Sequence, residues 1–252
     1  DQASKVYVRN KIKGCQEVGI RSYSFNLPAS ASQRDAENLV KELVASDNIH
    51  GILVQLPLPS HLDEQAILKL IPPAKDVDGF CAQNVGNLAM NRETIVACTP
   101  FGVMKLLEEY GVDPRGKNAV VLGRSNIVGK PMAQLMMQKQ YGDSTVTVCH
   151  SRSKTLKEEC READIIIAAI GQPDFVTADM VKEGAVVIDV GTTRVPDASR
   201  KSGFRLNGDV KFDEVAPKCS FITPVPGGVG PMTICSLMKN TLAAGKKEYY
   251  RQ

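Results

Sequence analysis

Two side chains near the start of the chain could carry out acid–base chemistry together. Tyr7 and Lys11 are four residues apart, so on a helix their phenol and amine lie on one face and can meet over a single pocket. The same spacing also occurs between solvated residues on exposed helix faces. The pair therefore predicts a site only if other polar groups join it.

Two further polar residues, Gln55 and Asp78, occur in settings that suggest a function. Gln55 ends an otherwise apolar run just before Pro57, and Asp78 lies beside Gly79 in a loop. Buried polar groups cost free energy unless they are paired, and groups of this kind gather at functional sites. The alternatives are that the Gln55 amide pairs with loop amides and that Asp78 is an Asx-turn residue.

A second set of candidates surrounds a glycine-bounded turn. Residues 119–122 are an apolar run, residues 123–129 form the turn, and Pro131 falls in the first turn of the following predicted helix. This order is typical of a dinucleotide-binding unit, although the pattern is G-x-S-x-x-x-G and not G-x-G-x-x-G. Similar turns occur in α/β proteins that bind no nucleotide, so the turn alone leaves both interpretations open.

Residues at two strand ends indicate which dinucleotide would bind. The predicted strand at 145–150 ends at Ser151, Arg152 and Lys154, where NAD sites usually place Asp or Glu. Arg124 follows the neighbouring strand, so these side chains fall at the edge where open α/β sheets bind ligands. Guanidinium groups suit a 2′-phosphate, and the pattern favours NADP over NAD. The alternative is that Arg124 and Arg152 are solvated cations of surface loops.

The elements that must position these groups alternate between helices and strands, which predicts an α/β fold with a mainly parallel sheet. We expect strands at 22–26, 51–56, 164–170 and 185–190, a polar loop at 192–208 and a closing helix at 234–246. The chain opens on a helix with no strand before it, so we expect that a first strand is missing.

Composition excludes several classes of protein. The net charge of +3 comes from 31 basic and 28 acidic residues spread along 252 positions, which argues against a nucleic-acid partner. No apolar run approaches the ~20 residues of a membrane span, so no membrane partner is expected. Seven cysteines without a C-x-x-C pair indicate reduced thiols, hence a cytoplasmic protein, or one of an organelle matrix if a targeting peptide was removed.

Other chemistries find no support in the sequence. The three histidines lack ligand spacing, so we predict no metal site. The G-x-S-x-G elbow of α/β-hydrolases and the G-K-[ST] sequence of phosphate-binding loops are also absent. Any catalysis must rest on amine, phenol, amide and carboxylate groups.

Five motifs taken together resemble one family across essentially the whole chain. They are YVRNK at 7–11, VQLPLP at 54–59, KDVDG at 75–79, GRS at 123–125 and PVPGGVGPMT at 224–233. In this order they resemble the bifunctional methylenetetrahydrofolate dehydrogenase/methenyltetrahydrofolate cyclohydrolase family. Thr192 and Thr193 depart from the family's usual Ile-Asn pair, and Ala97 stands where a proline is common.

The resemblance implies a role for each candidate. Lys11 would be the acid–base group of the cyclohydrolase step, Gln55 would hydrogen-bond it, and Tyr7 would stack on the aminobenzoyl ring of folate. Asp78 would hold the pterin edge. The folate cleft would be lined by Pro226, Gly227, Gly228, Val229 and Gly230, and NADP would contact Gly123, Arg124, Ser125, Ser151, Arg152 and Thr192.

The implied enzyme has two lobes with the active site in the cleft between them. Residues 1–98 with 223–252 would bind tetrahydrofolate derivatives, and residues 99–222 would bind NADP. The implied reactions are NADP-dependent oxidation of 5,10-methylenetetrahydrofolate to 5,10-methenyltetrahydrofolate and hydrolysis of that product to 10-formyltetrahydrofolate, in a homodimer.

Three alternatives remain open at this point. They are a dehydrogenase-only folate enzyme, a shikimate-dehydrogenase-like NADP oxidoreductase and a non-catalytic NADP-sensing module. Lys11 separates the last from the enzymes, because a sensor should tolerate its loss.

Overall fold

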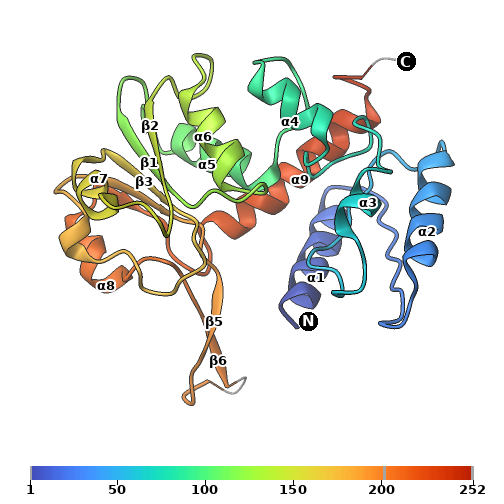
Figure 1. Ribbon diagram of the computed structural model, residues 1–252, viewed down its shortest axis with the longest axis horizontal. Helices are drawn as coiled ribbons and strands as arrows, with labels where there is room; N and C mark the ends of the chain where they lie inside the picture. The colour runs from blue at the N-terminus through green and yellow to red at the C-terminus, as the bar shows by residue number, and fades with distance from the viewer. Residues whose placement is uncertain (1, 201–202, 251–252) are drawn as a thin grey trace. The chain divides into compact units, whose positions relative to one another are not determined.

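The computed structural model describes residues 2–200 and 203–250, with side chains from residue 7 onward. The chain divides into two compact units (Figure 1). The first unit comprises Asp1–Cys98 with Ile234–Gln252, and the second comprises Thr99–Thr233. None of the helices in the described part of the chain is long and apolar enough to cross a bilayer.

The second unit is built on a five-stranded sheet in which every pairing is parallel. The strands are β1 (Asn118–Leu122), β2 (Thr145–Cys149), β3 (Ile165–Ala168), β4 (Val186–Asp189) and β7 (Phe221–Ile222), in the order β2-β1-β3-β4-β7. All residues of β3 and β4 are buried, as expected for central parallel strands covered on both faces. The predicted α/β fold with a mainly parallel sheet is confirmed.

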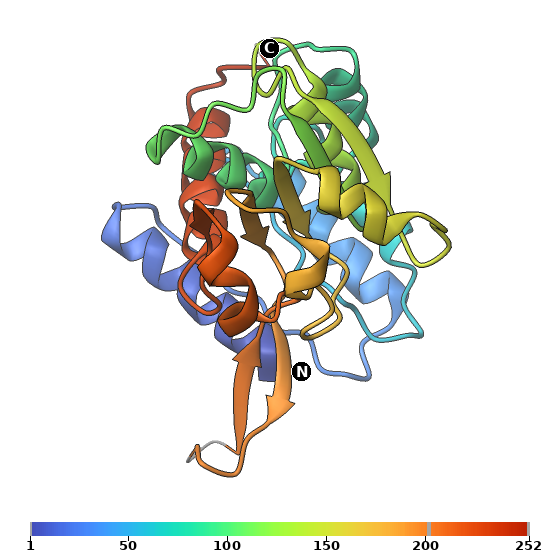
Figure 2. The same ribbon diagram turned by 90° about the vertical axis from the view of Figure 1, so that its left-hand side faces the viewer.

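Alternation along the strands divides the core of this unit between the two faces of the sheet. Val120, Leu122 and Ile166 belong to one buried cluster with Cys160 and Val215. Side chains one position along a strand point to the opposite face. Helices α5 (Cys98–Glu109), α6 (Gly129–Met137), α7 (Leu156–Glu162) and α8 (Phe212–Val215) surround the sheet (Figure 2).

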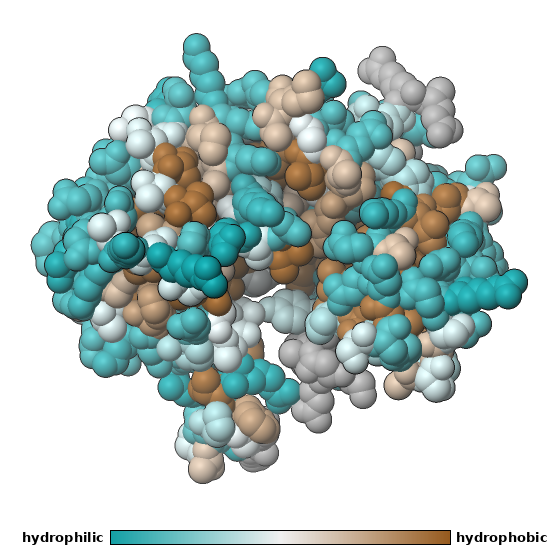
Figure 3. All heavy atoms as spheres, viewed as in Figure 1, coloured by the Kyte–Doolittle hydropathy of each residue, from teal (hydrophilic) through white to brown (hydrophobic). Residues whose placement is uncertain are grey.

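The polar loop expected at 192–208 is instead largely a hairpin. β5 (Thr193–Pro196) pairs antiparallel with β6 (Phe204–Asn207), and Figure 1 shows the hairpin projecting from the sheet of its unit. The Arg194 guanidinium lies 4.9 Å from the centre of the Phe204 ring, a cation–π contact across the two strands. Phe204 and Leu206 are exposed, and apolar residues are visible on the hairpin in Figure 3. Each strand is only four residues long and carries an arginine, so the apolar signal was weak and the prediction of a loop was wrong.

The first unit is mainly helical in the residues described. Its helices are α1 (Gln2–Glu17), α2 (Gln33–Ala45), α3 (Glu64–Leu68), α4 (Ala82–Ala89) and most of α9 (Val229–Gly245). Ser32 starts α2 with a capping box, in which the Ser32 hydroxyl accepts from the Asp35 amide and the Asp35 carboxylate accepts from the Ser32 amide. Ala36 and Val40, one turn apart, then bury one face of the helix.

Two predicted strands of the first unit are absent. Residues 22–26 form no ladder, and residues 51–56 contribute only an isolated bridge between Ile52 and Asp76. Residues 51–56 have the apolar composition of a strand, and residues 22–26 alternate polar and aromatic side chains as strands do. A strand also requires a neighbour to hydrogen-bond, and neither segment has one over its length. The closing helix also begins five residues earlier than expected, because Pro231 is accommodated in its first turn.

Candidate functional site

Lys11 and Gln55 form a direct contact within the first unit. The Lys11 Nζ donates to the Gln55 Oε1 at 3.1 Å, and the Gln55 Nε2 donates to the Leu56 carbonyl at 2.8 Å. The bond to Leu56 fixes the amide orientation, so its oxygen faces the lysine. Both side chains are partly buried. The structure therefore brings together two of the predicted catalytic residues, which lie 44 positions apart in the sequence.

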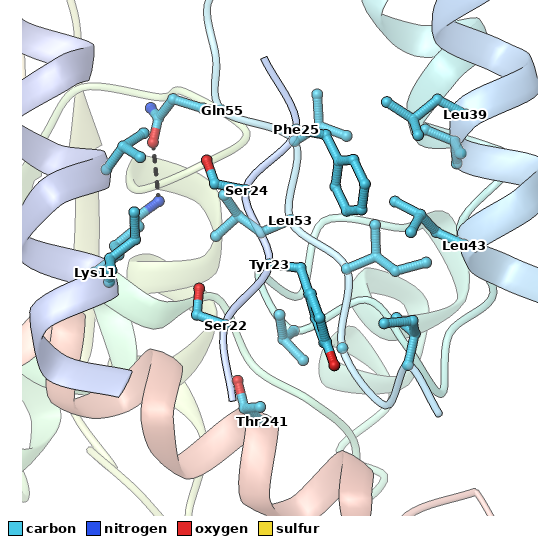
Figure 4. Close-up of a pocket in the computed structure, with 18 of the residues that line it drawn as sticks. Lys11, Ser22, Tyr23, Ser24, Phe25, Leu39, Leu43, Leu53, Gln55 and Thr241 are labelled. Atoms are coloured by element: carbon cyan, nitrogen blue, oxygen red, sulfur yellow. Dashed lines mark hydrogen bonds between the residues drawn. The ribbon is translucent and has the colours of Figure 1, made fainter. Parts of the chain in front are cut away.

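These two residues reach one wall of a pocket of about 990 Å³ that lies wholly within the first unit (Figure 4). In Figure 4, Ser22 and Ser24 lie on the side of their segment that faces Lys11 and Gln55. Tyr23 and Phe25 lie on the other side, with the Phe25 ring toward Leu39 and Leu43 of α2. This alternation is that of extended backbone. Tyr7 and Asp78 do not line this mainly apolar pocket, so it does not by itself unite the predicted folate contacts.

Asp78 is nevertheless electrostatically coupled to Lys11. Burial raises the pKa of Asp78 to about 6, the positive charge of Lys11 lowers it, and the charge of Asp76 raises it further. The Cys98 Sγ lies 4.0 Å from the Asp78 Oδ1 and contributes no charge, since burial raises the pKa of that thiol well above its usual value. Lys11 and Asp78 thus share one partly buried environment. Tyr7 is partly buried on α1, one helical turn before Lys11.

The loop that carries Asp78 is held by the side chain two residues before it. The buried Asp76 carboxylate accepts bonds from the amides of Gly79 (3.1 Å) and Cys81 (2.7 Å) and from the Asn84 Nδ2 (2.9 Å). These contacts tie the residue two positions before Asp78 to three residues that follow it. Asp78 is therefore presented by a fixed backbone and not by a mobile turn.

Asn240 of α9 supports the same loop from a distant part of the sequence. Its buried Nδ2 donates to the Val77 and Val96 carbonyl oxygens, both at 2.9 Å. The sequence predictions missed Asn84 and Asn240. A polar residue on the apolar closing helix was the available signal for Asn240, because such a residue needs buried partners.

The glycine-bounded turn of the second unit has the geometry of a close backbone approach. Gly123 has φ +113°, and a Cβ on it would lie 2.2 Å from the Ala169 carbonyl oxygen, so no side chain fits. The Ser125 Oγ accepts from the amides of Val128 (3.1 Å) and Gly129 (3.2 Å), which are the first amides at the start of α6. Arg124 is exposed between them.

Ser151 and Arg152 leave the sheet at the same edge. β1 and β2 are adjacent and in register through Leu122 and Cys149, so the residues after both strands emerge together. The Arg152 amide donates to the His150 Nδ1 at 3.2 Å, and Ser151 and Arg152 are exposed. A hydroxyl and two guanidinium groups thus stand at the carboxyl ends of neighbouring strands, beside a helix start that suits phosphate.

The remaining predicted residues also lie in or beside the second unit. Thr192 is exposed and follows β4 at the same edge of the sheet. Pro226 and Gly227 are exposed between β7 and α9, and the Gly228 amide donates to the Pro224 carbonyl at 3.0 Å. Val229 is buried and starts α9, followed by the partly buried Gly230. The donor set and the space at Gly123 fit a dinucleotide phosphate.

Comparisons with known proteins identify the family. Residues 1–78 match the model of the tetrahydrofolate dehydrogenase/cyclohydrolase catalytic domain, and residues 97–249 match that of the NAD(P)-binding domain of the same proteins. The chain is 62% identical over its whole length to the bifunctional protein FolD of Bacteroides fragilis and spans 86% of that protein.

Solved structures give the same result. The bifunctional enzyme FolD, methylenetetrahydrofolate dehydrogenase/cyclohydrolase, from Campylobacter jejuni is 47% identical with a TM-score of 0.91, over 98% of this chain and 85% of that one. The Trypanosoma brucei enzyme, complexed with NADP cofactor and inhibitor, is 45% identical with a TM-score of 0.93, over 98% and 84%. This chain belongs to the tetrahydrofolate dehydrogenase/cyclohydrolase family.

Proposed function

We propose that this protein oxidises 5,10-methylenetetrahydrofolate with NADP⁺ and hydrolyses the resulting 5,10-methenyltetrahydrofolate to 10-formyltetrahydrofolate. The observation that carries the proposal is the bond from the Lys11 Nζ to the Gln55 Oε1, found in a chain that belongs to this family. Of the alternatives raised by the sequence, neither a dehydrogenase-only enzyme, nor a shikimate-dehydrogenase-like oxidoreductase, nor an NADP sensor gains support from the comparisons.

In the cyclohydrolase step, Lys11 is the acid–base group. A water adds to the methenyl carbon, the neutral amine of Lys11 takes one proton from that water, and the resulting ammonium returns a proton to N5. As the carbon–N5 bond breaks, the remaining hydroxyl proton leaves to solvent and the formyl carbonyl forms. The net change is consumption of one water and release of one proton. Gln55 holds the amine in place through its oriented carbonyl oxygen.

In the dehydrogenase step, NADP⁺ accepts a hydride when it is bound, and the protein contributes alignment. Gly123 admits the backbone to the pyrophosphate, Ser125 shapes the turn, and Arg124, Ser151 and Arg152 hold the 2′-phosphate and ribose. Thr192 completes the cofactor contacts from the end of β4, which β3 separates from β1. Support comes from the exposure of Arg124, Ser125, Ser151, Arg152 and Thr192 at the carboxyl edge of the sheet.

The folate contacts follow the same logic. Asp78 accepts the N–H groups of the pterin edge, Tyr7 stacks on the aminobenzoyl ring, and the segment Pro226, Gly227, Gly228, Val229 and Gly230 lies against the ligand. The fixed loop around Asp78 supports its assignment to recognition, because a rigid acceptor loses little entropy on binding.

Lys11→Met tests the proposal most directly. We expect hydrolysis of methenyltetrahydrofolate to fall at least about 100-fold, since general acid–base catalysis contributes on that scale, while NADP⁺ affinity stays within about twofold. Lys13→Met is the matched control, because Lys13 is an exposed lysine on the same helix, paired with Glu17 at 3.6 Å. Unchanged hydrolysis in Lys11→Met would remove the cyclohydrolase assignment.

We also propose a cytoplasmic homodimer. All seven cysteines are unpaired, which suits a reducing compartment. The family resemblance supports the dimer. Light scattering of the purified protein at micromolar concentration should give a mass twice that of the chain, and a monomer mass would contradict it.

A further inference from the structure

Two buried carboxylates of the second unit have no place in the proposed chemistry. Asp189, the last residue of β4, is 3% exposed, and Asp209, which follows β6, is 0% exposed. Burying a carboxylate is costly unless several donors satisfy it. The position of those donors therefore indicates what the two residues do.

Asp189 binds the backbone on both sides of the hairpin. Its Oδ1 accepts from the amides of Gly191 and Asp209, both at 2.9 Å, and its Oδ2 accepts from the Val210 amide at 3.0 Å. Burial still raises the pKa of Asp189 to about 6, although these three bonds oppose the shift. Asp189 therefore links the segment just before the β5–β6 hairpin to the segment just after it.

Asp209 binds a third segment. Its Oδ2 accepts from the amides of Ile170 and Gly171 at 2.7 and 2.9 Å, in the loop that follows β3. Its Oδ1 is buried and has no hydrogen-bond partner. One oxygen of the carboxylate is thus hydrogen-bonded to the backbone of residues 170–171, and the other oxygen is enclosed by packed atoms.

Two glycines leave the room that this arrangement needs. A Cβ on Gly208 would lie 1.8 Å from the Asp189 Oδ2, and a Cβ on Gly191 would lie 2.4 Å from the Asp209 Oδ1. Both distances are far below any real contact, so the backbone packs directly on the carboxylates. The two acids and the two glycines form one closed unit, which we call the acid clamp.

The acid clamp acts on the loops at the carboxyl edge of the sheet. The loop after β3 continues from Ala169, whose carbonyl oxygen occupies the space where a Gly123 side chain would be. The loop after β4 continues from Gly191 directly to Thr192. The clamp therefore fixes one loop that backs the Gly123 turn and another that carries Thr192.

We propose that Asp189 and Asp209 are positioning residues for NADP, which set the loops at 169–171 and 190–192 for cofactor binding without contacting the cofactor. The inference rests on the proposed NADP site and adds two residues to it. Asp209 is the sharper probe, because its side-chain bonds go only to the loop after β3.

Asp209→Asn tests the inference at nearly constant volume. The amide would either turn its NH₂ toward the donors of Ile170 and Gly171 or bury that NH₂ where the Oδ1 now has no partner. We expect the NADP⁺ dissociation constant, measured by calorimetry, to rise about tenfold. This factor corresponds to ~1.4 kcal/mol, the free energy that one disturbed hydrogen bond contributes. Hydrolysis of methenyltetrahydrofolate without NADP should change less than about twofold, and KM should rise for NADP⁺ but not for methylenetetrahydrofolate.

Asp213→Asn is the matched control, since Asp213 is an exposed aspartate four residues further on. Unchanged NADP⁺ affinity in folded Asp209→Asn would overturn the inference, and so would equal losses of both activities, which indicate general destabilisation. Failure of the wild-type protein to bind NADP⁺ would instead overturn the proposed function.

Hydrogen exchange of the wild-type protein tests the clamp even if Asp209→Asn does not fold. The amides of Ile170, Gly171 and Gly191 should exchange slowly and should slow further when NADP⁺ is added. If the exchange rates of these amides did not change when NADP⁺ was added, a role in cofactor binding would be contradicted.

Discussion

Asp78 shows how burial sets the chemistry of a single residue. Its pKa of about 6 means that the free protein carries a protonated carboxyl below that pH, whereas recognition of pterin N–H groups requires the carboxylate as an acceptor. We therefore expect the affinity for tetrahydrofolate to rise as pH increases through about 6, and to be about tenfold weaker at pH 5 than at pH 7.5. Anaerobic calorimetry between pH 5 and 8 measures this directly.

Asp78→Asn supplies the comparison for that titration. The variant cannot ionise, so the ratio of its dissociation constant to that of the wild type should grow with pH, and this ratio cancels the titration of the ligand itself. A ratio that stays constant from pH 5 to 8 would show that Asp78 does not accept from the pterin.

Arg124 makes the corresponding prediction for the cofactor. A guanidinium bonded to a 2′-phosphate contributes a charge-assisted contact, so Arg124→Ala should weaken NADP⁺ about tenfold or more and leave NAD⁺ within about twofold. Arg115→Ala is the control, since Arg115 is exposed and paired with Asp113 at 2.7 Å. Equal losses for both cofactors in Arg124→Ala would exclude the 2′-phosphate contact.

The residues of the candidate site were predictable to different degrees. Arg124, Ser151 and Arg152 follow predicted strands, and the rule that parallel strands end at one edge is enough to place them together. Asp189 also ends an apolar run, but no pattern pairs it with Asp209 across the hairpin. The acid clamp depends on contacts between distant backbone segments, and local spacing does not encode them.

At the scale of the elements, the last described residue of the chain ties the segment after α9 to α4. The Tyr250 hydroxyl donates to the Asn84 Oδ1 and accepts from the Asn87 Nδ2 at 3.2 Å. The Thr94 hydroxyl donates to the same Asn84 oxygen at 2.7 Å and lies 3.0 Å from the Tyr250 oxygen. Asn84 is fully buried and also binds Asp76. The loop that presents Asp78 is thus supported through α4 by the carboxyl-terminal segment.

Tyr250→Phe should therefore destabilise the protein and loosen this loop. Removal of one partner from a buried polar network costs about 1–3 kcal/mol, which urea denaturation resolves as a lower midpoint. We also expect KM for methylenetetrahydrofolate to rise. Tyr110→Phe is the control, because Tyr110 is 63% exposed and its ring contact with Phe221 survives the change. An unchanged midpoint in Tyr250→Phe would show that the network contributes no stability.

The strands were predicted correctly where an apolar run also has a neighbouring strand to pair with. The apolar runs that became β1, β3 and β4 have parallel neighbours, and they are strands. Residues 22–26 alternate polar and aromatic side chains, a pattern typical of a half-buried strand, but they have no ladder partner. Strand formation depends on a neighbour that the pattern does not reveal. The β5–β6 hairpin is the opposite example: its two segments are too polar to predict strands, yet they pair with each other and form strands.

At the scale of the whole molecule, the proposed acid–base pair and the proposed cofactor contacts lie in different units. The Lys11–Gln55 contact lies in the first unit, and the Gly123 turn and the acid clamp lie in the second. Hydrolysis of methenyltetrahydrofolate consumes no cofactor, whereas its formation requires NADP⁺. Damage confined to the cofactor turn should therefore separate the two reactions.

Gly123→Ala tests this separation. The added methyl would meet the Ala169 carbonyl oxygen at 2.2 Å and would strain a backbone held at φ +113°, so the turn must move. We expect NADP⁺ affinity to fall at least about tenfold, as for the loss of a charge-assisted contact, and dehydrogenase turnover to fall with it, while cyclohydrolase turnover stays within about threefold. Gly184→Ala is the matched control, since Gly184 lies in the same unit at φ +77° but has no atom within 4 Å of the added carbon. If Gly123→Ala abolished both activities and Gly184→Ala neither, the hydrolytic site would need an intact cofactor turn, and the division of labour between the units would be wrong.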